Sequence, residues 1–206
     1  PNSNYAISKA AATHYAQWLA KSADLRCVTF RLYSIYGPYE EPTRLMPTLL
    51  VHGMRGALPP LVSPDTARDF VHVDDAVSAL ILAARSGTAA PGTIYNVASG
   101  VQTTLADVVG HARRTLGIAA EPAWGSMNRR EWDTIVWCGD PTALRDDLGW
   151  RAEIALPRGL ELTIEPGASG PVVTQVRGNP ADPLSRGHIC PKGVAIADVY
   201  TDPDRL

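Results

Sequence analysis

The stretch PNSNYAISKAAATHYAQWLAKSADLRCVTFRL, residues 1–32, sets the expected fold of the chain. Its first part, Tyr5–Lys21, is rich in alanine and free of glycine and proline, which predicts a helix that Ser3 or Asn4 can cap. The second part, Cys27–Leu32, is apolar and β-branched, as expected of a buried strand. The sequence therefore begins with a helix that leads into a strand.

The chain continues this alternation of helical and strand patterns to about residue 164. Short apolar runs typical of strands are followed by segments whose apolar residues recur at helical spacing. The expected helices are Leu45–Arg55, a segment around Val77–Ala84, Leu105–Leu116 and Pro141–Leu148, the expected strands are Asp69–Val73, Thr93–Ala98 and Thr134–Cys138, and Tyr33–Thr43 is expected to be a loop. Strands that alternate with helices favour an α/β domain with a parallel sheet.

Composition narrows the class of protein. The chain has 206 residues, of which 45% are hydrophobic and 19% charged, and its formal net charge is −2. This charge argues against a broad basic surface for nucleic acid or an anionic membrane. No apolar run approaches the roughly 18 residues that span a bilayer, and the widely spaced Cys27, Cys138 and Cys190 form no disulfide framework. We therefore expect a cytoplasmic protein with neither a nucleic-acid nor a membrane partner.

Tyr5 and Lys9 stand four residues apart on the first predicted helix, so their side chains share one face. A nearby ammonium favours the phenolate and lowers a tyrosine pKa from about 10 toward neutral pH. Such a tyrosine is able to exchange a proton with a hydroxyl while hydride leaves or joins the same carbon. Lys9 also has N–H donors for a cofactor ribose. The structural alternative for this pair is a packed ring beside a solvated lysine.

Five segments, in order, resemble the extended short-chain dehydrogenases/reductases of the NAD-dependent epimerase/dehydratase family. They are PNSNYAISKAAATHYA at 1–16, RLYSIYGPYEEPTRLMPTLL at 31–50, ARDFVHVDDAVSALILAA at 67–84, TIYNVASGVQTTLADVV at 93–109 and DPTALRDDLGWRAEIALPRGLELTI at 140–164. The resemblance covers residues 1–164. It implies the C-terminal part of an NAD(P)-binding Rossmann-type parallel sheet with the small substrate-binding subdomain, and it leaves an irregular tail rich in glycine and proline at 165–206.

This resemblance implies roles for residues near the first helix and strand. Tyr5 is then the acid/base residue, and Lys9 is the partner that lowers its pKa and binds the cofactor ribose. The backbone of Leu32, Tyr33 and Ser34 is implied to lie against the nicotinamide end of the cofactor. Ser34 stands where many relatives carry an asparagine that contacts substrate, and capping of the loop is its alternative role.

Two arginines, Arg68 and Arg130, are the candidates for a substrate diphosphate, because a guanidinium group matches phosphate oxygens in a bidentate manner. Arg130 lies in RREWD, which resembles the family's Arg-x-x-Asp segment. For Arg68 the alternative is an ion pair with Asp69 or Asp74. Asn96 ends a predicted strand where the family places substrate, although turns also favour asparagine.

Asp74 and Asp75 resemble a pair of catalytic carboxylates, but an aspartate that precedes an apolar helix is more often its N-cap. We therefore expect a capping role for this pair. His72 lies in an apolar strand and is expected to be a hydrogen-bonded core residue.

The Gly-rich fingerprint that seats a dinucleotide pyrophosphate belongs on the family's first strand, ahead of the position of Tyr5, and the sequence contains no such segment. We therefore expect a fragment that is inactive alone and holds no cofactor by itself. The complete enzyme is expected to use NAD or NADP on a nucleotide-activated sugar, and a homodimer is compatible with the resemblance.

The tail carries a second resemblance. GPVVTQVRGNPADPLSRGHICPKGVAIADVYTDPDRL, residues 170–206, resembles the iron–sulfur segment of molybdopterin-dependent oxidoreductases. Cys190 matches the last of four thiolate ligands to a cluster there, and Lys192 matches a lysine between cluster and pterin. Because the sequence just upstream holds no further cysteine ligands, we expect Cys190 to be a free thiol and no metal to bind. Such a tail indicates a fusion or a joining of two reading frames.

Three functions remain open from the sequence. The first is a nucleotide-sugar epimerase or 4-keto-sugar reductase that works by transient hydride transfer; the others are an iron–sulfur electron-transfer protein and a non-catalytic remnant. PPLVSPDTARDF at 59–70, WGSM at 124–127 and WDTIVW at 132–137 favour an epimerase or a reductase over a dehydratase.

Overall fold

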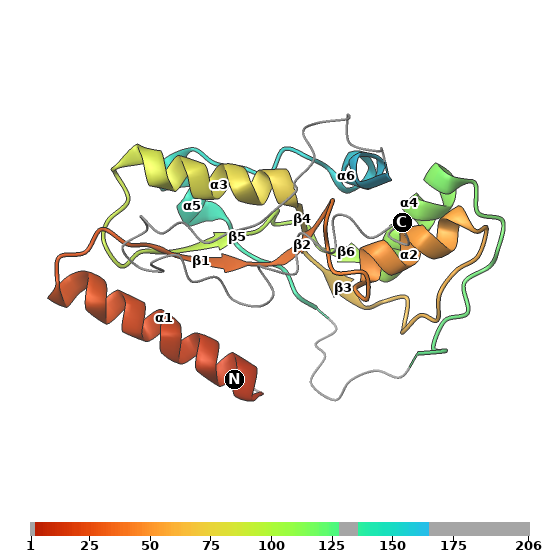
Figure 1. Cartoon of the computed structure of the whole chain (residues 1–206), viewed down its shortest axis with the longest axis horizontal. Helices are drawn as coiled ribbons and strands as arrows, with labels where there is room; N and C mark the ends of the chain where they lie inside the picture. Colours follow the sequence, from red (N-terminus) through yellow and green to blue (C-terminus); the bar gives the residue numbers. More distant parts are fainter. Residues whose placement is uncertain (1–2, 128–135, 165–206) are drawn as a thin grey trace, which may run out of the picture. The chain divides into compact units, whose positions relative to one another are not determined.

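Helix α1 (Asn4–Ser22) is the first element of the structure, a computed structural model that describes residues 3–127 and 136–164 (Figure 1). Its first turn is closed by Ser3, whose side-chain oxygen accepts a hydrogen bond of 3.2 Å from the backbone N–H of Ala6. This bond satisfies one of the N–H groups that a helix leaves unpaired at its start. The predicted helix and its serine cap are confirmed.

The strands of the described residues form three short pairs. The parallel pairs are β1 (Thr29–Leu32) with β5 (Ile94–Val97) and β2 (Ser34–Tyr36) with β4 (Phe70–His72), and the antiparallel pair is β3 (Ala67–Arg68) with β6 (Thr103–Thr104). Thr29 lies opposite Ile94 and Ser34 lies opposite Phe70. Parallel pairing needs a long crossover between the paired strands, and helices supply it here, as the α/β prediction requires.

Two strand predictions need correction. Strand β2 lies inside Tyr33–Thr43, which glycine and proline content predicted to be a loop. Its partner β4 comes much later in the chain, so no local pattern reveals the pairing. The strand expected at Thr134–Cys138 is wrong where it can be compared, because residues 136–138 belong to no strand, and residues 134–135 lie outside the described part.

Five helices follow α1 in the described part. They are α2 (Leu45–Met54), α3 (Val73–Ser86), α4 (Leu105–Leu116), α5 (Thr142–Leu148) and α6 (Leu156–Ile164). Helix α4 coincides with its prediction because its signals are local: Thr104 and Asp107 form a capping box at its start, and Gly117 ends it in the left-handed conformation. Helix α6 has no counterpart among the predicted helices.

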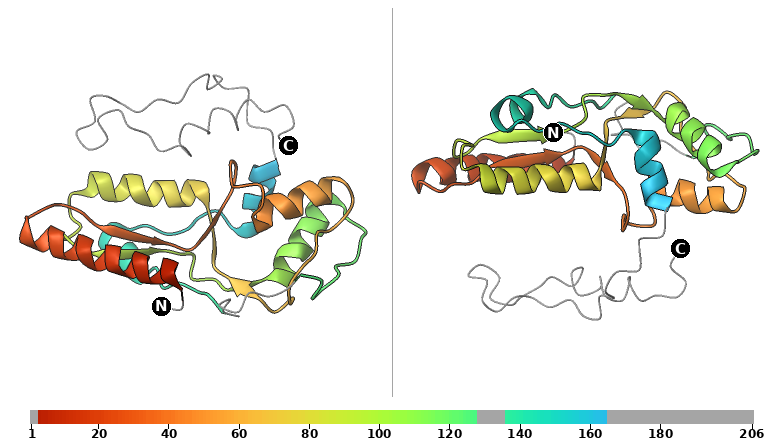
Figure 2. Two further views of the ribbon diagram at one scale, coloured as in Figure 1. Left: turned by 60° about the horizontal axis from the view of Figure 1, so that its bottom comes forward. Right: turned by 90° about the horizontal axis from the view of Figure 1, so that it is seen from above.

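Helices α1 and α3 lie on opposite sides of the β1–β5 pair, whereas α2 and α4 lie side by side at the other end of the described part (Figures 1 and 2). One hydrophobic core packs α3 and α5 against β5, and its buried members include Val71, Ala79, Tyr95, Val97, Leu144 and Trp150. The second packs α2, α4 and α6 around Tyr36, and includes Leu49, Leu50, Val108, Val109 and Leu160. The arrangement is the Rossmann-type α/β fold expected from the sequence. Within residues 3–127 and 136–164, no helix combines the length and the apolar character that a membrane crossing requires.

Candidate active site

Tyr5 and Lys9 lie on one face of α1, as their spacing predicts. The Nζ atom of Lys9 lies 5.5 Å from the centroid of the Tyr5 ring, which is the distance of a cation–π contact. The Tyr5 side chain is 71% exposed. A ring this exposed is not packed into either hydrophobic core of the described residues. The catalytic role of Tyr5 stays a prediction.

The backbone of Leu32–Ser34 is held from two sides as the chain passes from β1 to β2. The N–H of Tyr33 donates to the carbonyl oxygen of Val97 at 3.2 Å, and the N–H of Ser34 donates to that of Asp69 at 3.0 Å. Burial, together with the nearby Asp69 carboxylate, raises the pKa of Tyr33 above its ordinary value of 10.0. Tyr33 is therefore a neutral phenol at physiological pH, and the two hydrogen bonds hold its segment between the end of β5 and the start of β4.

Asp69 is a fully buried carboxylate at the junction of the two parallel strand pairs. Its Oδ1 atom accepts hydrogen bonds from the N–H and the hydroxyl of Ser99, at 2.8 and 2.6 Å. Its Oδ2 atom accepts from the N–H groups of Gly100 and Gly139, at 3.0 and 3.1 Å. Asp69 thereby ties the segments that follow β5 and precede α5 to the start of β4. Sequence reasoning considered it only as a partner for Arg68, whose Nη1 atom donates to the carbonyl oxygen of Ala67 at 2.8 Å.

A pocket of about 270 Å³ lies beside β2 and the start of α2, and it brings together two of the predicted substrate residues, Ser34 and Arg68. Glu40, Arg44 and Thr66 are its other polar lining residues. The remaining walls come from Ile35, Tyr36, Leu45, Met46, Val62, Phe70, Leu105 and Met127. Apolar walls with a few convergent polar groups are typical of small-molecule sites.

The lining of this pocket carries two guanidinium groups, of Arg44 and Arg68, and one carboxylate, of Glu40. Arg44 occupies the N-cap position of α2 and makes no side-chain capping bond there, and its Nε atom lies 2.8 Å from Oε1 of Glu40. A helix start offers unpaired N–H groups and a partial positive charge, which favour an anion. With Arg68 in the same lining, the pocket suits a ligand that carries phosphate at one end.

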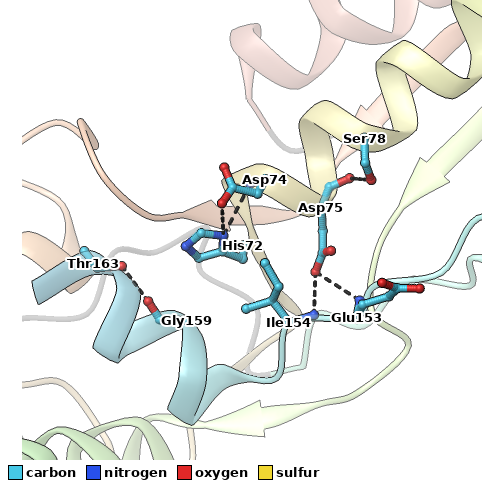
Figure 3. A network of polar contacts seen from close by, with 8 residues as sticks. All are labelled: His72, Asp74, Asp75, Ser78, Glu153, Ile154, Gly159 and Thr163. Carbon is cyan, nitrogen blue, oxygen red and sulfur yellow. Dashed lines mark hydrogen bonds and ion pairs between the residues drawn. The ribbon is translucent and has the colours of Figure 1, made fainter. Parts of the chain in front are cut away.

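The paired aspartates after β4 have structural roles, and neither is the N-cap of α3. The helix begins at Val73 with His72 as its N-cap, so Asp74 and Asp75 lie in its first turn. Oδ2 of the buried Asp75 accepts hydrogen bonds from the N–H groups of Glu153 and Ile154, at 3.1 and 2.9 Å (Figure 3). Asp75 thus fastens the segment before α6 to the start of α3. The capping prediction is wrong because the strand ends earlier than its apolar pattern suggests.

His72 is buried as predicted, but it is not fully hydrogen-bonded. Its Nδ1 atom accepts from the N–H of Asp74 at 3.3 Å, while Nε2 has no hydrogen-bond partner among the described residues. Burial lowers the pKa of His72 below its ordinary value of 6.5, and the carboxylates of Asp74 and Asp75 offset this only in part. His72 is therefore neutral near pH 7.

The other predicted site residues lie elsewhere. Asn96 is on β5, and its side-chain amide donates to the carbonyl oxygen of Asp140 at 3.0 Å, so this side chain stabilises the turn before α5. It does not line the described pocket. Arg130, Cys190 and Lys192 lie outside the described residues. Within the described ranges no cluster of His, Cys, Asp or Glu is arranged to hold a metal ion.

Sequence reasoning missed Glu40, Arg44 and Asp69. Arg44 carried a usable signal, because a basic residue directly before a predicted helix lies at its anion-attracting end. Glu40 and Asp69 carried none, since their importance comes from burial and from partners that only the tertiary structure brings near.

Comparisons with known proteins identify relatives of this chain and of its fold. Residues 1–98 match the model of the NAD dependent epimerase/dehydratase family. A probable dTDP-glucose 4,6-dehydratase from Sinorhizobium fredii is 30% identical over 172 residues, which cover 80% of this chain and 49% of the relative. A crystal structure of UDP-glucose 4-epimerase from Thermotoga maritima with UDP-glucose superposes with a TM-score of 0.71 at 26% identity, covering 79% of this chain and 52% of that one. The Bordetella bronchiseptica enzyme WbmF in complex with NADH gives a TM-score of 0.67 at 29% identity, covering 79% and 52%.

The chain spans about half the length of the curated relatives it matches.

Proposed function

The chain belongs to the NAD-dependent epimerase/dehydratase family, and we propose that it supplies the proton-transfer helix and the substrate pocket of a nucleotide-sugar epimerase or 4-keto-sugar reductase. The observation that carries this proposal is the pocket in which Ser34 and Arg68 lie together, beside the start of α2. UDP-glucose and dTDP-glucose, which appear in the names of the relatives, are ligands of the kind that such a pocket accepts.

The polar and the apolar walls of the pocket are assigned to different parts of the ligand. Arg68 and Arg44 offer guanidinium N–H donors, and the start of α2 offers backbone N–H groups, for the diphosphate. The apolar walls bury the less polar faces of the ligand, which adds affinity in proportion to the area removed from water. Arg130 is a further candidate for the diphosphate on the strength of its sequence motif.

Tyr5 is the residue that we assign to proton transfer at a sugar hydroxyl. Lys9 lies beside its ring, with Nζ 5.5 Å from the ring centroid. Tyr5 and Leu32 are 71% and 53% exposed, which fits a site whose apolar surface a nicotinamide ring covers. Lys9 and the backbone of Leu32–Ser34 would hold that end of NAD or NADP, which supplies a hydride acceptor and donor when bound.

Binding to the full 206-residue chain tests the substrate class directly. Isothermal titration with UDP-glucose and dTDP-glucose is expected to show saturable binding, whereas free glucose is expected to bind far more weakly. Arg68→Ala is expected to weaken nucleotide-sugar binding by about 1.5–3 kcal/mol, as for other charge-assisted hydrogen bonds. Arg151, an exposed arginine in the segment between α5 and α6, provides a matched control as Arg151→Ala.

Failure of the wild-type chain to bind either nucleotide sugar would contradict the proposal. Equal losses in Arg68→Ala and Arg151→Ala would show that the effect is one of general charge and would remove Arg68 from the site.

A further inference from the structure

Glu40 is the one acidic residue in the described lining of the pocket, and only one of its two carboxylate oxygens has a partner there. Oε1 lies 2.8 Å from Nε of Arg44. Oε2 is buried and has no hydrogen-bond partner among the described residues. The Glu40 side chain is only 12% exposed, whereas that of Arg44 is 56% exposed. Glu40 therefore lies on the inner side of its ion pair.

The backbone before Glu40 is held in an unusual conformation that places this carboxylate. Tyr39 has φ of 68°, a left-handed conformation that a tyrosine rarely adopts. Gly37 has φ of 144°, and a Cβ atom there would lie 2.6 Å from Cγ1 of Val73. The turn closes with a hydrogen bond of 3.3 Å from the N–H of Glu40 to the carbonyl oxygen of Gly37. Strained backbone of this kind is retained where it positions a functional group.

A buried acceptor without a donor is unfavourable unless a ligand or a proton fills it. Burial raises the pKa of Glu40, and Arg44 acts in the opposite direction. The phosphates of a nucleotide sugar carry only acceptor oxygens and are repelled by a carboxylate. Its hydroxyl groups and the base N–H are donors, and they fit an unfilled carboxylate oxygen.

We propose that Glu40 is a specificity-determining residue whose Oε2 atom accepts a hydrogen bond from an O–H or N–H donor of the nucleotide sugar. This inference rests on the proposed function of the same pocket. Oε1 meanwhile holds Arg44 by its Nε atom, which leaves the outer N–H groups of that guanidinium for phosphate. Glu40 thus separates the donor groups of the ligand from its phosphates.

Glu40→Gln in the full chain tests this assignment, because glutamine keeps the size of the side chain and removes its charge. UDP-glucose, dTDP-glucose and inorganic pyrophosphate are the probes, titrated at fixed ionic strength. We expect the variant to lose about tenfold in affinity for UDP-glucose, in line with a lost charge-assisted hydrogen bond. Pyrophosphate has neither a carbon-bound hydroxyl nor an N–H group to donate. It is therefore expected to bind the variant as tightly as the wild type, or more tightly.

Glu41→Gln is the matched control, since Glu41 is exposed and its Oε1 atom contacts the hydroxyl of Thr43 at 3.2 Å. This variant is expected to bind every probe as the wild type does. Circular dichroism and thermal unfolding of both variants show whether the fold is retained.

Comparison of UDP-glucose with dTDP-glucose shows which group of the ligand donates the hydrogen bond to Glu40. If the loss is confined to UDP-glucose and absent for dTDP-glucose, the donor is the ribose 2′-hydroxyl; if it is equal for both, the donor is a hexose hydroxyl, the 3′-hydroxyl or the base N–H. Unchanged affinity for both nucleotide sugars in Glu40→Gln would overturn the assignment while leaving the proposed function intact. Equal losses for pyrophosphate and nucleotide sugars would also overturn it, because Glu40 would then act only through Arg44. Absence of nucleotide binding by the wild type would overturn both.

Discussion

Replacement of Asp69 by asparagine is expected to loosen the loops at the junction of the strand pairs. In the wild type, four hydrogen bonds of 2.6–3.1 Å reach this buried carboxylate, three of them from backbone N–H groups. Asparagine keeps one carbonyl oxygen for Ser99. Its NH₂ group then faces the N–H groups of Gly100 and Gly139, so two donors lose their acceptor.

The magnitude follows from these two lost bonds. A hydrogen bond to a charged group contributes about 1.5–3 kcal/mol, and an orphaned buried N–H group has a cost of similar size. Allowing for relaxation of the loops, we expect Asp69→Asn to lower the free energy of unfolding by about 3–5 kcal/mol. A typical domain has only about 5–15 kcal/mol in total, so the variant is expected to fold but to be marginally stable.

Urea unfolding of the full chain measures this loss, and hydrogen exchange locates it. The amides of Gly100 and Gly139 are expected to exchange faster than in the wild type. The matched control is Asp65→Asn, because Asp65 is exposed and nearby in sequence, and its stability is expected to equal that of the wild type. A loss below about 1 kcal/mol in Asp69→Asn, with unchanged exchange at both glycines, would refute the role assigned to these bonds.

Three further predictions concern catalysis, nucleotide-sugar binding and the pH dependence of stability. In a chimera that joins the amino-terminal half of a relative to residues 1–164, Tyr5→Phe is expected to lower kcat by at least about 100-fold with little change in nucleotide-sugar affinity; near-normal turnover would remove Tyr5 from the mechanism. Arg130→Ala is expected to weaken nucleotide-sugar binding by about 1.5–3 kcal/mol without changing that of the free sugar, as measured by titration, and equal losses would indicate a structural residue. Because burial lowers the pKa of His72 in the folded chain, its contribution to stability is present above pH 6.5 and is lost as pH falls through the lowered value. His72→Asn, which keeps an acceptor for the N–H of Asp74, is expected to flatten the decline in urea stability between pH 7 and pH 5; an unchanged slope would assign that decline to other groups.

The sequence predicted best the elements whose signals are local. Helix α4 begins and ends as expected because its capping box and its C-terminal Gly117 lie within or beside the helix. Helix α1 behaves in the same way through Ser3. The shared face of Tyr5 and Lys9 follows from helical spacing alone, so this part of the candidate site was also predictable.

Contacts between distant segments could not be predicted. Strand β2 is invisible in a loop-like sequence because its pairing depends on β4. The donors to Asp69 include Gly139, which lies 70 residues later, and those to Asp75 include Glu153, which lies 78 residues later. A single sequence contains no record of such pairings. The interpretation of Asp75 as a helix cap and of Asp69 as a partner of Arg68 therefore rested on residues adjacent in the sequence.

Among the described residues, the carboxylates of Asp69, Asp75 and Glu40 differ in how their charge is matched, and this difference separates a structural role from a functional one. Asp69 and Asp75 each accept hydrogen bonds from backbone N–H groups of distant segments, so their charge is matched by the fold itself. Glu40 is matched on one oxygen only, by a side chain that reaches toward solvent. Loss of charge at Asp69 or Asp75 should therefore lower stability, whereas Glu40→Gln should leave stability equal or slightly higher, because an unmatched buried charge disfavours folding. A carboxylate that does not stabilise the fold and yet lines a ligand pocket must be explained by what it binds. Parallel urea unfolding of Asp69→Asn, Asp75→Asn and Glu40→Gln decides this: a loss of stability in Glu40→Gln as large as that in the two aspartate variants would show that Glu40 is structural as well.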